Sequence, residues 1–227
     1  MELAGTKAGR ELYEAWREGN DLPAKHVTAP LARTAAIQYL TETQVNSLTG
    51  AFQEGHDSSP TKAKRKLRGL YWLTFLVLRY TGARFGEALS IDEKIDIDFR
   101  NTGIRLIPLK RHNSRTQTRI VPVPGNVINE IASYIAEFPD QKGIVFKLDQ
   151  GNFRRIFYGR ARTVDIPKDA AHPHILRHTR AIELLRASVP VTVVQDILGH
   201  SALTTTAIYL KIPGQEAKEI LKDKGLI

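Results

Sequence analysis

The 227-residue sequence predicts an α+β fold that is mostly helical and carries a small antiparallel sheet. Two observations predict this fold. Apolar residues recur at helical spacing in most segments after residue 40, whereas between residues 95 and 123 they alternate with polar residues around the turn Asn101-Thr102-Gly103. The order of helices, sheet and further helices favours one body in which helices pack against the sheet.

The chain divides near residue 37. Residues 8–19 predict a short amphipathic helix, and the prolines in residues 22–30 are typical of an extended linker. We therefore expect residues 1–37 to form a short N-terminal helix with a linker, and residues 38–227 to form the main domain with a helix at its C-terminus.

Two helices are expected at the start of the main domain. Thr41 followed three residues later by Gln44 is a capping-box pattern, so the first helix should begin there. Its apolar face is expected to comprise Val45, Leu48 and Phe52. The second helix runs from Lys62 to about Thr81, and Gly82 is expected to end it in a tight turn.

The sheet and the later helices follow. Ile95, Ile97 and Phe99 alternate, and residues 119–123 alternate again, which predicts an antiparallel sheet whose hairpin carries residues 110–118 at its tip. Helical spacing returns in residues 126–138, 151–161, 175–187, 191–198, 203–211 and 215–224. Gly199 is expected to close the helix over residues 191–198.

The composition excludes several classes of protein. Without cysteine there is no disulfide framework, no cysteine-ligated metal and no thiol nucleophile. The longest apolar stretch, residues 71–78, is far shorter than the roughly 18 to 20 residues that span a bilayer, so no membrane partner is expected. These features indicate a cytoplasmic protein, associated with the nucleoid if the source is prokaryotic.

The positive charge is concentrated after residue 37. The chain has 33 Lys and Arg against 24 Asp and Glu, a net charge of +9, and within residues 1–37 the acids and bases cancel. A polyanion such as DNA is the partner that this charge favours, although each basic stretch alone is equally compatible with a solvated surface. The residues expected to bind a DNA backbone are Lys62, Lys64, Arg65, Lys66, Arg111, Arg115, Arg154 and Arg155.

Three further segments carry side chains suited to phosphate chemistry. Arg84 follows a glycine turn at a helix start, where its guanidinium and backbone N–H groups can meet a phosphate, or where it can simply pair with Glu87. His174 and Arg177 are spaced to share one helix face. The third segment is Leu198-Gly199-His200, followed nine residues after His200 by Tyr209. The histidines of residues 172–178 lack nearby carboxylates or thiolates, so no metal site is expected.

Together with a lysine on the hairpin, these segments resemble the catalytic domain of the tyrosine recombinases, the integrase family, over about residues 38–211. The resemblance implies the fold of that domain. It also implies a role for each matching position. The implied catalytic residues are Arg84, Lys110, His174, Arg177, His200 and the nucleophile Tyr209, with Glu87 supporting Arg84. Arg111 and Arg115 lie on the same hairpin and remain alternatives to Lys110.

The resemblance further implies a site-specific recombinase that cleaves and rejoins DNA through a 3′-phosphotyrosine, without metal, ATP or cofactor. Such enzymes act in DNA recombination and in the integration of mobile genetic elements, whether plasmid or viral. The implied partners are double-stranded DNA and other protomers of the same protein, as a dimer or tetramer on DNA.

Some features depart from the family or admit another interpretation. Only 37 residues precede the catalytic region, too few for the family's usual DNA-clamping domain, so the chain is either a fragment or a minimal enzyme. The helix over residues 215–224 can dock on a neighbouring protomer or on its own core. The alternative functions are DNA relaxation like that of type IB topoisomerases, and non-catalytic DNA binding, since residues 191–209 also predict a helix-turn-helix.

Overall fold

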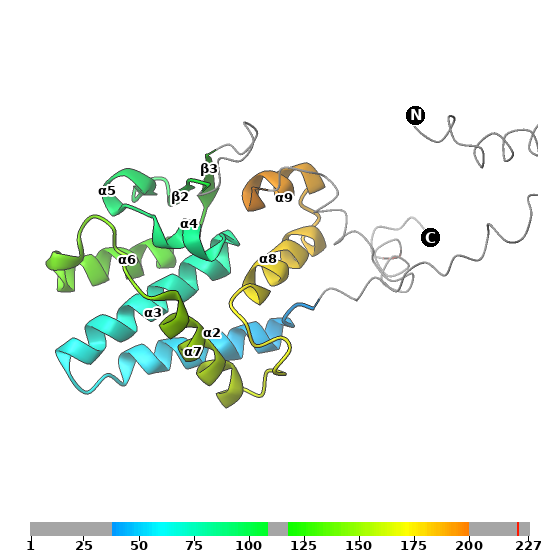
Figure 1. Ribbon diagram of the computed structural model, residues 1–227. Coiled ribbons are helices and arrows are strands. Elements are labelled where there is room, and N and C mark those ends of the chain that lie inside the picture. The colour runs from blue at the N-terminus through cyan, green and yellow to red at the C-terminus, as the bar shows by residue number, and fades with distance from the viewer. Residues whose placement is uncertain (1–37, 109–117, 200–221, 223–227) are drawn as a thin grey trace, which may run out of the picture. The chain divides into compact units, whose positions relative to one another are not determined.

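Figure 1 shows a computed structural model of the chain, which describes residues 38–108, 118–199 and 222. The elements in chain order are α2 (Glu42–Asp57), α3 (Lys62–Thr81), α4 (Phe85–Leu89), α5 (Glu93–Asp96), β1 (Ile97–Asp98), β2 (Gly103–Leu106), β3 (Arg119–Pro122), α6 (Gly125–Glu137), the 3₁₀ helix η2 (Pro139–Gln141), α7 (Gln150–Thr163), α8 (Ile175–Arg186) and α9 (Val191–Leu198). The expectation of a mostly helical fold with a small antiparallel sheet is confirmed.

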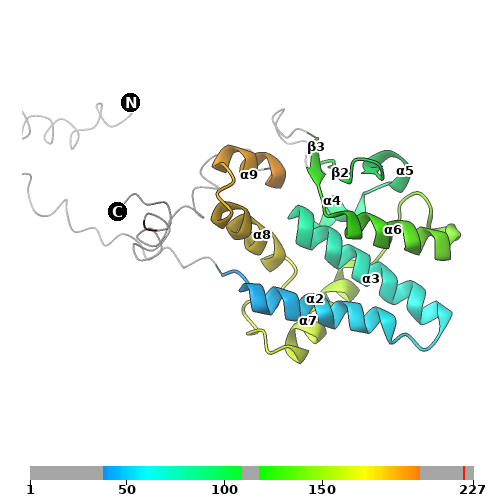
Figure 2. The ribbon, with the colours of Figure 1, turned by 180° about the vertical axis from the view of Figure 1, so that it is seen from behind.

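The first helix of the described residues, α2, begins at the predicted capping box. The Thr41 hydroxyl accepts a hydrogen bond from the backbone N–H of Gln44 at 3.2 Å, and the Gln44 side chain accepts one from the backbone N–H of Thr41 at 3.0 Å. The predicted inner face of α2 is buried. In it, Phe52 stacks on Phe75 of α3 with ring centroids 4.3 Å apart, so α2 and α3 pack side by side (Figure 2).

The helix at the centre of the fold is α3. Its middle is buried on all sides, as expected of a helix that is apolar around its whole circumference. It contacts α2, α4, α6 and α8. At 1.5 Å per residue its 20 residues extend about 30 Å, and its basic start and its C-terminus therefore lie far apart.

Gly82 ends α3 as predicted, with φ of 62° in the left-handed region. A side chain there would also lack space, because a Cβ would lie 2.6 Å from Cδ2 of Leu198, which belongs to α9. Gly82 thus allows the sharp turn between α3 and α4 and also the close approach of α9 to that turn.

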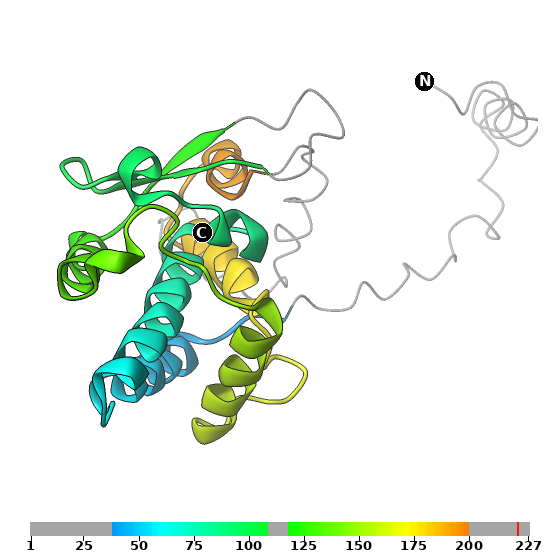
Figure 3. The ribbon, with the colours of Figure 1, turned by 60° about the vertical axis from the view of Figure 1, so that its left-hand side comes forward.

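The sheet has the order β1-β2-β3 with both pairings antiparallel. In the hairpin of β2 and β3, Ile104 pairs with Val121 and both are buried. The next pair, Arg105 and Ile120, lies on the opposite face, because successive residues of a strand alternate. Leu106 and Arg119 therefore share the inner face with Ile104 and Val121. Figure 3 shows the sheet beside the end of α3 and next to α9.

The strand expected over residues 95–99 is shorter than predicted. Residues 93–96 form the helical turn α5, β1 has two residues, and Ile95 and Phe99 are exposed. Aspartate side chains explain the difference. Asp92 accepts the N–H of Lys94 at 2.9 Å, and Asp98 accepts the N–H groups of the following turn at 2.9 and 3.0 Å. Such local bonds compete with strand pairing and outweigh the apolar alternation.

The remaining predicted helices are present within two residues of their expected ends, where they fall in the described part of the chain. Gly199 closes α9 with φ of 67°, as expected. The segments predicted as helices over residues 8–19, 203–211 and 215–224 lie outside the described residues. Among the described helices none is long and apolar enough to cross a membrane.

The chain enters this body along α8. Residues 38–40 each contact α8 or the loop before it. Gln38 donates to Asp169, Tyr39 accepts a bond from Arg186 at 2.9 Å, and the N–H of Leu40 donates to Thr179 Oγ1 at 2.9 Å. The Thr179 hydroxyl in turn donates to a backbone carbonyl of α8. The entry segment is therefore fixed to α8 before α2 begins.

We expect Thr41→Ala to lower the free energy of unfolding by about 1 kcal/mol, because it removes the side-chain cap from the start of α2. Urea unfolding measures this change. Thr43→Ala, at an exposed position of the same turn, is the control and should change stability by less than about 0.5 kcal/mol. Equal effects of the two substitutions would contradict the cap.

Candidate active site

Four of the residues implied as functional fall in the described part of the chain: Arg84, Glu87, His174 and Arg177. They lie at the N-terminal ends of α4 and α8, next to the C-terminus of α3. The implied catalytic residues Lys110, His200 and Tyr209, together with Arg111 and Arg115, lie outside the described residues.

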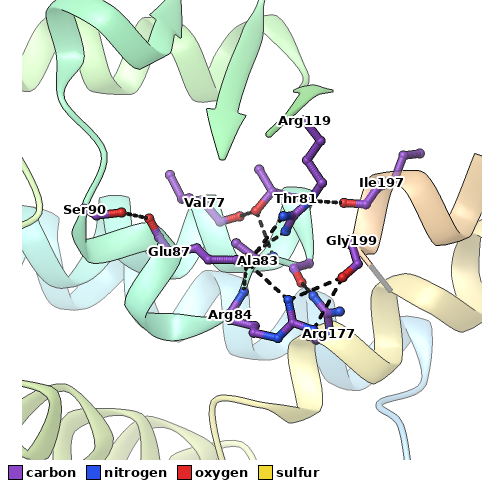
Figure 4. Close-up of polar contacts among 11 residues, drawn as sticks. Val77, Thr81, Ala83, Arg84, Glu87, Ser90, Arg119, Arg177, Ile197 and Gly199 are labelled. Carbon is purple, nitrogen blue, oxygen red and sulfur yellow. Dashed lines mark hydrogen bonds and ion pairs between the residues drawn. The ribbon is translucent and has the colours of Figure 1, made fainter. Parts of the chain in front are cut away.

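The turn before α4 is shaped by Thr81. Its hydroxyl donates to the carbonyl of Val77 at 2.6 Å and accepts the N–H of Ala83 at 3.1 Å (Figure 4). These bonds, together with the left-handed Gly82, place Arg84 as the N-cap residue of α4. The turn is thereby fixed by backbone and hydroxyl contacts.

Arg84 is held from two sides. Its Nη1 donates to Glu87 Oε1 at 3.1 Å, and both terminal nitrogens lie 3.4 Å from the carbonyl oxygen of Gly199. Its side chain remains 48% exposed. The backbone N–H of Arg84 donates to Glu87 Oε2 at 2.9 Å. That amide is therefore engaged, and an anion would meet the guanidinium of Arg84 instead.

Glu87 is shared by two arginines. It is 2% exposed, and besides Arg84 it pairs with Arg119 of β3, whose Nη2 lies 2.7 Å from Oε2 and whose Nη1 lies 3.3 Å from Oε1. Burial by itself would raise the pKa of Glu87, but the hydrogen bonds and positive charges of Arg119 and Arg84 outweigh burial and lower this pKa below its ordinary value. Glu87 is therefore an anion that anchors both arginines.

Arg177 lies in the first turn of α8 and is 3% exposed. Its Nη1 donates to the carbonyl oxygen of Gly82 at 2.7 Å, which ties α8 to the turn before α4. An arginine keeps its proton even when buried. Arg177 therefore brings a permanent charge to the same turn that carries Arg84.

His174 immediately precedes α8 as its N-cap residue. Burial lowers its pKa, and the charges of Arg177, His172 and Arg84 lower it further. Its ring meets that of His178 edge to face at 4.7 Å. Burial, with smaller effects from the charges of His174, His172 and Arg177, lowers the pKa of His178 to about 4. At neutral pH both imidazoles are therefore uncharged, and His174 can accept a proton.

The histidines do not make a metal centre in the part of the chain that the structure describes, where no group of three or more His, Cys, Asp or Glu side chains is placed to hold an ion. What the residues form instead is a pair of fixed guanidinium groups beside a neutral imidazole. Such a group can bind a phosphate oxyanion through charge-assisted hydrogen bonds and can move a proton next to it.

The basic stretches are placed differently. Lys62, Lys64, Arg65 and Lys66 open α3, at the opposite end of that helix from Gly82. In this stretch Arg65 pairs with Glu137 at 3.1 Å and Lys66 with Asp140. On α7, Arg155 donates to Asn152 at 2.9 Å, whereas Arg154 lies close enough to His172 for its charge to lower the pKa of that histidine, next to burial. Of the two described stretches, the one on α7 is nearer the candidate site.

Arg119 is the residue that sequence reasoning assigned only to a strand. Its partnership with Glu87 had one sequence signal, namely its position two residues before Val121 on the inner face of β3. A charged side chain on an inner face requires a buried counter-charge. That signal could be used only once the register of the hairpin was known.

Comparison with known proteins identifies the relatives of this chain. Residues 38–215 match the family model of the phage integrase family. A tyrosine recombinase of Thermosipho africanus is 33% identical over 210 residues, which make up 88% of this chain and 66% of that protein. This chain thus spans about two-thirds of the relative's length.

Solved structures resemble the fold. The XerH site-specific recombinase, in a post-cleavage complex bound to palindromic difH substrate, has a TM-score of 0.67 at 18% identity, over 86% of this chain and 54% of that chain. The catalytic domain of bacteriophage HP1 integrase has a TM-score of 0.55 at 22% identity, over 82% of this chain and 94% of that chain. The described residues therefore have the fold of a tyrosine recombinase catalytic domain.

We expect Glu87→Gln to lower the free energy of unfolding at neutral pH by about 3 kcal/mol, because Arg119 stays buried without its carboxylate. Folding lowers the pKa of Glu87, so the wild type has this stabilisation above the ordinary carboxyl pKa of 4.5 and loses it as the pH falls through the lowered value. The difference in unfolding free energy between wild type and Glu87→Gln, measured by urea unfolding, should therefore become smaller as the pH falls through the lowered pKa of Glu87. Exposed Glu54→Gln is the control, and a gap that stays constant on acidification would contradict the assignment.

Proposed function

Since the chain belongs to the phage integrase family, we propose that residues 38–227 are the catalytic domain of a tyrosine-type, site-specific DNA recombinase. Residues 1–37 precede this domain as a helix and linker in the same proposal. The domain would cleave one DNA strand through a covalent phosphotyrosine and rejoin it to another.

One observation carries the proposal. The fold brings Arg84 and Arg177, which are far apart in the sequence, to the same turn, and the charges of both act on His174. A phosphodiester gains negative charge on its non-bridging oxygens as it is attacked, and two permanently charged guanidinium groups stabilise that charge. A neutral imidazole beside them suits proton transfer.

Cleavage would start at Tyr209. Its phenolic oxygen attacks the phosphorus, the new oxygen–phosphorus bond forms, and the bond from phosphorus to the 5′-oxygen breaks. The phenolic proton passes to neutral His174, and Lys110 gives a proton to the departing 5′-oxygen. A phenol has a pKa near 10, so the positive field of Arg84, Arg177 and His200 is needed to favour its deprotonation. The products are a 3′-phosphotyrosine and a free 5′-hydroxyl.

Rejoining reverses these steps with a different strand. The 5′-hydroxyl of another strand attacks the phosphotyrosine, the tyrosine leaves, and a proton returns to it. The phosphotyrosine keeps the energy of the ester that was broken, so the reaction needs no ATP. Because the arginines provide the positive charge around the phosphate, the proposal includes neither a metal ion nor a cofactor.

The proposed substrate is double-stranded DNA, in the cytoplasm. The XerH site-specific recombinase is in a post-cleavage complex with palindromic difH substrate, which supports this choice. Exchange of strands requires a second cleaved strand nearby, so we propose that protomers act together on DNA as a dimer or tetramer. Non-catalytic helix-turn-helix binding would use α9 and the segment after it, but would give no role to the pairing of Arg84 with Glu87. DNA relaxation shares the cleavage step and differs in needing no second duplex.

We expect the protein to form a covalent adduct with nicked suicide duplexes of randomised sequence, in EDTA, and Tyr209→Phe to abolish the adduct because the phenolic oxygen is lost. A band that survives denaturing electrophoresis and disappears on proteolysis measures the adduct. Tyr158→Phe, which changes an exposed tyrosine of α7, is the matched control and should leave the yield unchanged. An adduct that persists in Tyr209→Phe would remove this residue as the nucleophile, and no wild-type adduct on any duplex would refute the enzymatic proposal.

We also expect the Kd for duplex DNA to rise steeply with salt, since backbone contacts release counterions. Arg154→Gln should lower the slope of log Kd against log salt by about one, because one phosphate contact is lost. Titrations at several salt concentrations test this, with Lys94→Gln, an exposed change outside the basic stretches, as the control. A salt-independent Kd for the wild type would overturn the assignment of backbone contacts.

A further inference from the structure

We propose that Arg119 is a positioning residue that holds the three catalytic segments of the site in register, an inference that rests on the proposed function. Arg119 opens β3 and is 9% exposed, so it does not face a substrate. Its contacts nevertheless reach the two other segments that carry implied catalytic residues.

All three nitrogens of the Arg119 guanidinium donate hydrogen bonds. Nη1 and Nη2 bind the two oxygens of Glu87, on α4, and Nε donates to the carbonyl oxygen of Ile197, on α9, at 2.8 Å. This is a two-sided use of the planar fork, which a lysine cannot reproduce with its single nitrogen. Because Glu87 and Arg119 are both buried, the pair is sensitive to small shifts.

The end of α9 packs directly on the same group. A Cβ on Gly199 would lie 2.7 Å from Nη1 of Arg119, so a side chain at this position would push against the guanidinium. Its φ of 67° favours glycine as well. The carbonyl of Gly199 then accepts from Arg84, and Arg84 pairs with Glu87. These contacts connect Ile197, Arg119, Glu87, Arg84 and Gly199, and the backbone from Ile197 to Gly199 closes them into a ring (Figure 4).

Each segment in this ring continues into an implied catalytic position. In the sequence, Lys110 lies between β2 and β3, Arg84 is the N-cap residue of α4, and His200 comes next after Gly199. A change at Arg119 should therefore displace all three positions together, although Arg119 touches no reacting atom. Geometric misplacement of about 1 Å costs a reaction on the order of 100-fold in rate, while binding of the DNA backbone should be little affected.

The test compares Arg119→Met with Arg105→Met. Arg105 is on the neighbouring strand and also pairs with a buried carboxylate, Asp96, at 2.8 Å, but on the opposite face of the sheet. Single-turnover adduct formation is measured with saturating suicide duplex, well below the unfolding midpoint of each variant. We expect Arg119→Met to lose about 100-fold in this rate with Kd for DNA unchanged within about threefold, and Arg105→Met to react like wild type.

Two further variants keep the proposal open to refutation if Arg119→Met folds poorly. Arg119→Lys retains the charge and should fold, yet should give an intermediate rate because it cannot hold both partners. Adding Glu87→Gln to Arg119→Lys should lower the rate by less than the product of the two single effects, since both act through one ring. The proposal would be overturned if Arg119→Lys reacted at the wild-type rate, or if Arg105→Met lost as much rate as Arg119→Met. It would also be overturned if the rate losses of Arg119→Lys and Glu87→Gln multiplied in the double variant. Failure of the proposed function is distinguished because Arg105→Met and wild type would then form no adduct.

Discussion

The carboxylate of Glu87 is the contact on which the site depends. Two guanidinium groups of unequal exposure share it: Arg119 is buried, whereas about half of the Arg84 side chain faces solvent. One negative and two positive charges leave a surplus of positive charge, and geometry directs that surplus to the exposed side, at Arg84. The interior is thus neutralised while the surface stays attractive to an anion, as electrostatic preorganisation requires.

The helix ends could be predicted because local chemistry decides them. The capping box of Thr41 and Gln44 correctly predicted the start of α2. Gly82 and Gly199 correctly predicted the ends of α3 and α9, and both adopt the left-handed conformation that glycine favours. The strand over residues 95–99 was predicted too long, since alternation records which residues are apolar but not which backbone groups an aspartate captures. The side chains of Asp92 and Asp98 shorten the strand through hydrogen bonds to nearby backbone N–H groups, which the apolar alternation does not reveal.

The site was predictable as a set of residue types and not as a network. The motifs gave Arg84, Glu87, His174 and Arg177, and the structure brings them to one turn. The contribution of Arg119 depends on which face of β3 it occupies, and a hairpin register cannot be counted from one strand alone. The same holds for the carbonyl oxygens of Gly82 and Gly199, because any residue has a carbonyl and only the fold decides where it points.

The anchoring of residues 38–40 has a mechanical consequence. A pull on the chain at Gln38 is resisted by Asp169, in the loop before α8, and by Thr179 and Arg186 of α8, before it reaches α2. Helix α8 also carries Arg177 in its first turn. A force applied at residue 38 would thereby reach the helix that positions Arg177, so the start of the described body is mechanically coupled to the candidate site.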